Sequence, residues 1–177
     1  MSEYCVVVAD ASRARLFTLE RAKHPAVESG PNLKELKSLL NADKELPKRD
    51  LYSNTRGGAN RASGTGARAT DDHRERHAME REKRFARIAT TELRKLVAES
   101  GADHVVLCAS ARMLGFLRKE FSGHNGVELH DVPRDMTKMA PAGIHAHLAK
   151  TGLLPALQKH SRAWRTCAQR SRTAAKA

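Results

Sequence analysis

Short apolar runs and amphipathic stretches alternate along this chain. The first run, YCVVVA at 4–9, is rich in β-branched residues and predicts a buried strand. A tight turn, DASRAR, separates it from LFTL at 16–19, so the two runs predict a β-hairpin. The stretch NLKELKSLL at 32–40 is ambiguous, because its leucines have helical spacing and its local propensity is helical.

The second half of the chain repeats strand and helix patterns. HVVLCA at 104–109 follows a helical pattern and therefore predicts a buried strand parallel to an earlier one. Ser110 is placed to cap the next helix, and a shorter strand is expected at 127–132. Pro141 opens a further helix. The helix after Ser110 has an apolar face made of Met113, Leu114, Leu117 and Phe121.

Between these halves lies a basic stretch that changes character. Residues 51–70 are rich in glycine and arginine and predict a flexible basic loop. A long helix should follow, with Asp72 and Glu75 spaced as in a capping box. It should end near Gly101. The arginines of the loop are Arg56, Arg61 and Arg68.

One face of the long helix starts charged and becomes apolar. Phe85, Ile88, Ala89 and Leu96 form an apolar stripe at 3- and 4-residue spacings. Unpaired charge is costly to bury, so the first two or three turns should project beyond the domain body and could bind a polyanion. The alternative is a solvated helix with pairs such as Glu80–Arg84. The charged part of the stripe consists of Arg74, His77, Arg81 and Arg84.

Composition favours an acidic partner. The 177 residues carry a formal net charge of +12, which points to nucleic acid more than to an anionic membrane. Aromatic residues make up only 4%, so contacts to phosphate are expected rather than base stacking. Residues 156–177 form either a basic arm that orders on RNA or a floppy tail. The arginines of this extension are Arg162, Arg165, Arg170 and Arg172.

Several other classes of protein are disfavoured. No apolar run approaches a membrane span, and the charged N-terminus is unlike a secretory leader, so the cytoplasm is expected. The three cysteines have no CxxC spacing, and neither a metal site nor a disulfide is expected. His145 and His147 are two apart on a helix and point to different sides. No glycine motif for phosphate or nucleotide cofactors is found, so no cofactor is expected.

Three blocks of the chain resemble a known bacterial family. They are VVVADASRARLF at 6–17, the helix–strand–helix segment at 84–121, and RDMTKMAPAGIHAHL at 134–148. The family is described as host attachment protein, or protein required for attachment to host cells, and is grouped with relatives of the archaeal–eukaryotic class 1 release factor. The family-motif positions in this sequence are Asp10, Arg13, Arg15, Asp135, Thr137 and Lys138.

This resemblance implies a fold. The expected domain, residues 1–155, is of the α/β class, with a mixed five-stranded sheet in the order 3-2-1-4-5 and helices on both faces. It would be ribonuclease-H-like, as in the middle domain of the release factor. In that fold the stretch at 32–41 is the third strand, which decides the ambiguity against local propensity.

The resemblance also bears on function. The release factor's Gly-Gly-Gln loop is missing here, since Gly57-Gly58 is followed by Ala59 and Asn60. We therefore expect a non-catalytic RNA- or ribosome-binding protein related to translation factors. The first alternative is a role in bacterial attachment to a host cell. The second is a metal-dependent nuclease using Asp10 with Asp131 and Asp135, although the sequence contains no recognisable carboxylate triad.

Overall fold

The computed structural model describes residues 2–22, 24, 28–42, 66–122 and 126–158, with the backbone alone for 66–74. Five strands form a single sheet in the order β3-β2-β1-β4-β5, which confirms the predicted order. The strands are β1 (Tyr4–Ala9), β2 (Arg13–Glu20), β3 (Asn32–Leu40), β4 (His104–Ala109) and β5 (Glu128–Val132). The helices are α3 (Gly66–Ser100), α4 (Ala111–Phe121) and α5 (Pro141–Lys150).

The sheet is mixed, as predicted. Strand β1 pairs antiparallel with β2 and parallel with β4, while β5 continues the parallel part. Strand β3 pairs antiparallel with β2 from Arg13↔Leu40 to Glu20↔Asn32. The leucine spacing in β3 does not mark a helix face, because Leu36 and Leu40 are 48% and 60% exposed on this edge strand. Pairing with β2 therefore prevails over helical propensity.

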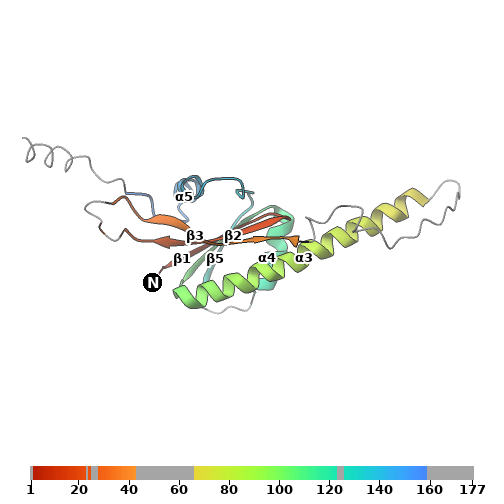
Figure 1. The fold of residues 1–177 in the computed structure, drawn as a ribbon, viewed down its shortest axis with the longest axis horizontal. Coiled ribbons are helices and arrows are strands. Elements are labelled where there is room, and N and C mark those ends of the chain that lie inside the picture. Colours follow the sequence, from red (N-terminus) through yellow and green to blue (C-terminus); the bar gives the residue numbers. More distant parts are fainter. Residues whose placement is uncertain (1, 23, 25–27, 43–65, 123–125, 159–177) are drawn as a thin grey trace, which may run out of the picture.

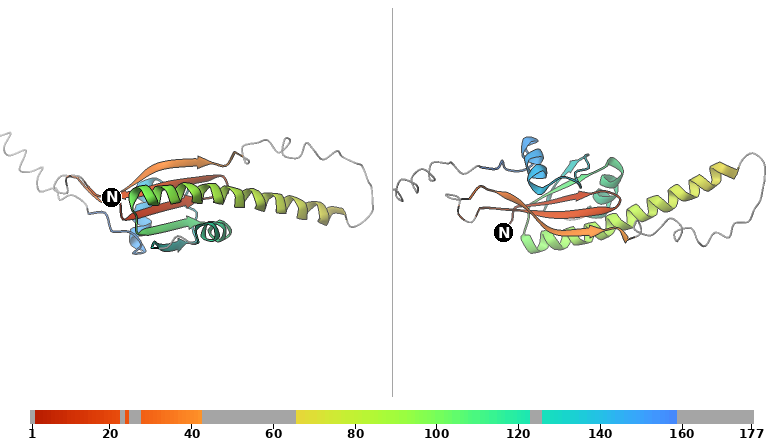
Figure 2. Two further views of the ribbon diagram at one scale, coloured as in Figure 1. Left: turned by 90° about the horizontal axis from the view of Figure 1, so that it is seen from below. Right: turned by 45° about the horizontal axis from the view of Figure 1, so that its top comes forward.

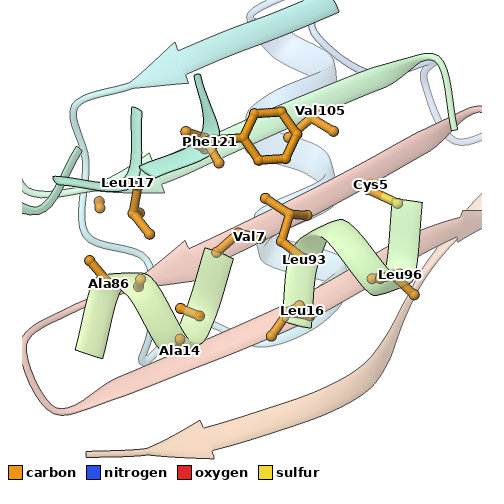
Figure 3. Packing of buried hydrophobic residues seen from close by; sticks show 14 of the residues in the cluster. Cys5, Val7, Ala14, Leu16, Ala86, Leu93, Leu96, Val105, Leu117 and Phe121 are labelled. Atoms are coloured by element: carbon orange, nitrogen blue, oxygen red, sulfur yellow. The ribbon is translucent and has the colours of Figure 1, made fainter. Parts of the chain in front are cut away.

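Helices cover both faces of the sheet (Figure 1). On one face, Leu93 of α3 and Leu117 of α4 pack over Val7 and Val105 (Figure 3). On the other face, α5 buries Ile144 and Leu148 against a second apolar cluster. The predicted apolar face of α4 is confirmed, because its four residues are all buried. Ser110 is the N-cap residue of α4, but its side chain forms no capping hydrogen bond.

Helix α3 differs from prediction at its start. It begins at Gly66, so Asp72 and Glu75 lie inside the helix and do not cap it. Residues 66–70 are therefore helical, whereas a flexible loop was expected there. The remainder of that predicted loop lies outside the described residues. At its other end, the Gly101 N–H donates to the Val97 carbonyl (2.9 Å) with φ +65°, which confirms the predicted stop.

The N-terminal half of α3 projects beyond the sheet, as the charge pattern predicted (Figures 1 and 2). The apolar stripe needs one correction, because Ile88 is 49% exposed. The stripe that faces the sheet leaves out Ile88. It consists of Phe85, Ala86, Ala89, Leu93, Leu96 and Val97. Arg84, one turn before Ile88, is accordingly exposed, whereas Arg81, one turn before Phe85, is half-buried.

Candidate functional site

The carboxyl ends of β1, β4 and β5 meet at one edge of the sheet, because these strands are parallel. Asp10 directly follows β1, and residues 133–140 lead from β5 into α5. Arg15 lies near the start of β2, beside Val8 of β1. Five polar side chains meet here and are called the carboxyl-end cluster: Asp10, Arg15, Glu35, Asp135 and Thr137.

Arg15 is the buried centre of the cluster, with only 7% of the residue exposed. Its Nε and Nη2 donate to the two carboxylate oxygens of Glu35 at 3.1 and 2.5 Å. Its Nη1 donates to the carbonyls of Thr137 (3.0 Å) and Met139 (2.7 Å). Its Cζ lies 4.9 Å from the ring centroid of Phe17. One guanidinium thus joins β2 and β3 to the loop before α5.

The charge of Arg15 acts on its partner. The Arg15 hydrogen bonds lower the pKa of the Glu35 carboxyl, and the charges of Arg15 and Arg13 add to this effect. The Glu35 side chain keeps 28% of its surface exposed, so water still reaches the pair. The ionised form of Glu35 is therefore favoured in the folded protein.

Asp10 organises the turn between β1 and β2. Its Oδ1 accepts the backbone N–H groups of Ser12 (2.5 Å) and Arg13 (2.7 Å). Its Oδ2 lies 3.1 Å from Thr137 Oγ1, which is also 2.7 Å from Asp135 Oδ1. The single hydroxyl proton of Thr137 can serve one of these carboxylates at a time. The threonine therefore bridges two acids that are 125 positions apart in sequence.

The resemblance named six positions, and four of them meet in this cluster. Arg13 is exposed and donates from Nε to Ser38 Oγ at 3.0 Å, while Lys138 faces solvent. Glu35 was missed, because an acid on an edge strand has no distinguishing pattern in the sequence. Its role depends on the β2–β3 register, which places Glu35 beside Phe17 and on the same face as Arg15.

The carboxylates of the nuclease hypothesis do not meet at one point. Asp131 pairs with Arg118 of α4, on the opposite face of the sheet from the carboxyl-end cluster. Both oxygens of Asp10 are engaged with Ser12, Arg13 and Thr137. These hydrogen bonds indicate that Asp10 stabilises the turn between β1 and β2.

The predicted RNA-binding residues lie mostly outside the described side chains. Of these residues, His77 and Arg84 are exposed on α3 and Arg81 is half-buried. Their surroundings are of mixed charge: Lys83 pairs with Glu80 (3.6 Å), and Arg112 of α4 pairs with Glu82 (3.9 Å). Arg68 and Arg74 lie in α3 without a described side chain. Outside the described residues are Arg56, Arg61, Arg162, Arg165, Arg170 and Arg172.

Two of the cysteines and both helical histidines lie among the described residues. Cys5 and Cys108 are buried and free, and burial raises the pKa of Cys108 to about 12. His145 is buried with Nε2 2.9 Å from the Pro155 carbonyl oxygen, whereas His147 is half-buried near Arg134. The two histidines therefore do not form a metal pair. Cys167 lies outside the described residues.

A second polar cluster lies at the opposite, amino end of the parallel strands. It consists of His104, Glu128 and His130 and is called the amino-end cluster. These residue types are able to bind a metal ion, and sequence analysis missed them. The Glu-x-His spacing in β5 was a usable signal, because residues two apart on a strand share a face. The third member could not be found without the β4–β5 register.

The residues that match a known family are nearly the same as those that form the strands and helices. In the described part of the chain, no helix has the length and apolar composition needed to cross a bilayer. A comparison with curated proteins gives no match. The model of a family described as protein required for attachment to host cells matches residues 5–148, a span that contains both clusters. The relation to release factors stays a prediction. The family itself is established by this match: the chain belongs to the family of proteins required for attachment to host cells.

Proposed function

We propose that this protein takes part in the attachment of a bacterial cell to a host cell. The family match over residues 5–148 is the observation that carries the proposal. Within that span, the carboxyl-end cluster connects the first and last of the blocks that resemble the family, through Asp10, Arg15 and Thr137. This connection joins the two blocks in one domain of this chain.

The projecting half of α3 is the surface that we assign to the partner. It stands clear of the sheet, so the sheet does not block a large partner there (Figure 2). Residues 75–87 contain five Lys or Arg against three Glu, and the whole chain is strongly basic. An anionic partner surface is therefore favoured. Arg81 and Arg84 are the described positions through which we test it.

The test compares bacteria that carry or lack the gene in their adhesion to cultured host cells. Loss of the gene should reduce the number of bound bacteria, and a wild-type copy should restore it. A copy with Arg81→Gln and Arg84→Gln should restore it only in part. The matched control, Arg21→Gln with Lys34→Gln, removes two positive charges from the exposed pairs with Glu3 and Glu20. Equal adhesion with and without the gene would overturn the proposal. Labelling of intact cells would separate direct from indirect action.

A second candidate is non-catalytic binding of RNA or the ribosome. The basic, projecting α3 favours it, because phosphate contacts need exposed cations. RNA affinity should fall linearly with the logarithm of salt concentration. The Arg81→Gln and Arg84→Gln changes should each reduce that slope by roughly 0.7–0.9, equally across RNA sequences.

The same control variant and thermal melts make the RNA experiment specific. Identical slopes for wild type and the α3 double variant would remove α3 as the RNA contact, even if the protein binds RNA elsewhere. Both candidates are non-catalytic. Magnesium-dependent RNA cleavage that disappears in Asp10→Asn would instead support the nuclease hypothesis.

A further inference from the structure

The amino-end cluster is built by strand pairing. His104 begins β4, and its Cα partner in the parallel strand β5 is Glu128. His130 lies two residues further along β5, so all three side chains are on the same face of the sheet. Because these positions belong to paired strands, the backbone holds the three Cα positions at fixed spacing.

The distances within the cluster fit a transition-metal site. His104 Nδ1 is 3.3 Å from Glu128 Oε2, and His130 Nε2 is 3.3 Å from Glu128 Oε1. All three ligand atoms lie within 4.8 Å of one another. Two ligands bound to Zn²⁺ at about 2.0–2.1 Å in tetrahedral geometry are separated by about 3.3–3.4 Å. Each nitrogen–oxygen separation matches this value, although the two nitrogens face different oxygens of Glu128. The Glu128 side chain must therefore turn to bring one oxygen to both nitrogens.

A buried nitrogen that makes no hydrogen bond supports a ligand at this place. His104 Nδ1 is buried and forms no hydrogen bond within the described structure, because its contact with Glu128 lacks hydrogen-bond geometry. An unsatisfied buried nitrogen is costly, and a metal ion would use its lone pair. The Tyr4 ring stacks on His104 with centroids 4.8 Å apart and an interplanar angle of 15°. This stacking holds the imidazole plane in a fixed orientation.

The cluster remains open to solvent on one side. The Glu128 and His130 side chains are 62% and 30% exposed, and β5 is the edge strand of the sheet. An ion can therefore enter without unfolding the domain. Imidazole and carboxylate together suit Zn²⁺, whereas Mg²⁺ and Ca²⁺ favour sites made of oxygen ligands.

We propose that His104 Nδ1, one carboxylate oxygen of Glu128 and His130 Nε2 bind a Zn²⁺ ion. Three protein ligands leave a fourth position for water or for a group from a partner. The ligand set carries one negative charge, which partly neutralises the ion. This site is separate from the surface of α3 that we assign to the attachment partner, so the two proposals stand or fall independently.

Zinc binding to the full-length, untagged protein is the direct test. Purified metal-free protein is titrated with Zn²⁺ against a chromogenic chelator, and Co²⁺ is added in parallel to give the visible absorption of a tetrahedral site. One equivalent of Zn²⁺ should bind. Glu128→Gln and His130→Asn should each weaken binding by more than about 100-fold, beyond the 10-fold to 100-fold range typical of residues that only support ligands.

The control variant is His147→Asn, which removes another half-buried histidine and should leave zinc affinity unchanged. His104→Asn should also abolish tight binding. Since that change disturbs the stack with Tyr4, the exposed Glu128→Gln variant keeps the test valid if His104→Asn does not fold. Absence of Zn²⁺ binding at micromolar free metal would overturn the proposal. So would stoichiometric binding that Glu128→Gln and His130→Asn leave unchanged.

Discussion

The two polar clusters lie on the same face of the sheet but at opposite ends of its parallel strands. In the carboxyl-end cluster, all three guanidinium nitrogens of Arg15 donate hydrogen bonds. In the amino-end cluster, the buried Nδ1 of His104 lies 3.3 Å from Glu128 Oε2 but forms no hydrogen bond with the described residues. The first cluster directs its hydrogen bonds inward and serves to hold segments together. The second leaves capacity open and is suited to bind something else.

The largest effect should come from Arg15→Ala. The change would leave Glu35 and the carbonyls of Thr137 and Met139 without their donor. We expect a loss of about 3 kcal/mol in the free energy of unfolding, at the low end for a broken buried ion pair because Glu35 is partly exposed.

Urea unfolding measures this loss, with Arg13→Ala as the matched control from the same strand. Arg13 is exposed, and the hydrogen bond described for its side chain goes to Ser38, so its change should cost less than about 1 kcal/mol. If the two variants were equally stable, Arg15 would not be the centre of a structural cluster.

Thr137→Val should have the next largest effect. The substitution nearly conserves shape but removes the hydroxyl between Asp10 and Asp135. A loss of about 1–2 kcal/mol is expected, because two carboxylates are left facing an apolar group. Thr91→Val is the control, since the exposed Thr91 hydroxyl donates only to a carbonyl within α3. A Thr137 variant as stable as the Thr91 variant would show that the bridge contributes nothing.

The pH dependence of stability tests the Arg15–Glu35 pair more finely. The pKa of Glu35 is lowered in the folded protein, chiefly by its hydrogen bonds to Arg15. Its contribution is therefore complete above the ordinary value, about 4.3, and is lost as the pH falls through the lower folded value. The difference in unfolding free energy between wild type and Glu35→Gln should shrink as the pH falls from 7 to 3. A constant difference would contradict this assignment.

The sequence predicted the interior of this fold better than its edges. Strands β1 and β4 are buried on both faces, so their apolar runs are unambiguous. Edge strand β3 has exposed leucines and could be placed only through family resemblance. Ile88 was assigned to the buried face because the spacing of apolar residues alone cannot fix the angle at which α3 meets the sheet.

The same distinction holds for the candidate sites. Asp10 and Arg15 were found because they lie in a block that resembles the family, and their meeting with Thr137 follows from the parallel strands. Glu35 and His104 have no local signal, because their partners lie on neighbouring strands. Their roles depend on register, which a single sequence does not encode in a readable pattern.

The smallest effect should come from His130→Asn in metal-free protein, and it decides whether the comparison between the clusters is sound. His130 is half-buried at the sheet edge, and its contact with Glu128 is exposed to water. Such a pair contributes little, so the free energy of unfolding should change by no more than about 0.5 kcal/mol in the presence of a chelator. Urea unfolding of His130→Asn and Arg15→Ala under the same conditions compares the contributions of the two clusters to stability directly. A loss above about 1.5 kcal/mol would mean that the amino-end cluster also stabilises the fold by itself. A small loss would mean that His130 contributes little to folding. Its side chain is 30% exposed and its backbone is held in β5, so it would then be suited to bind a ligand.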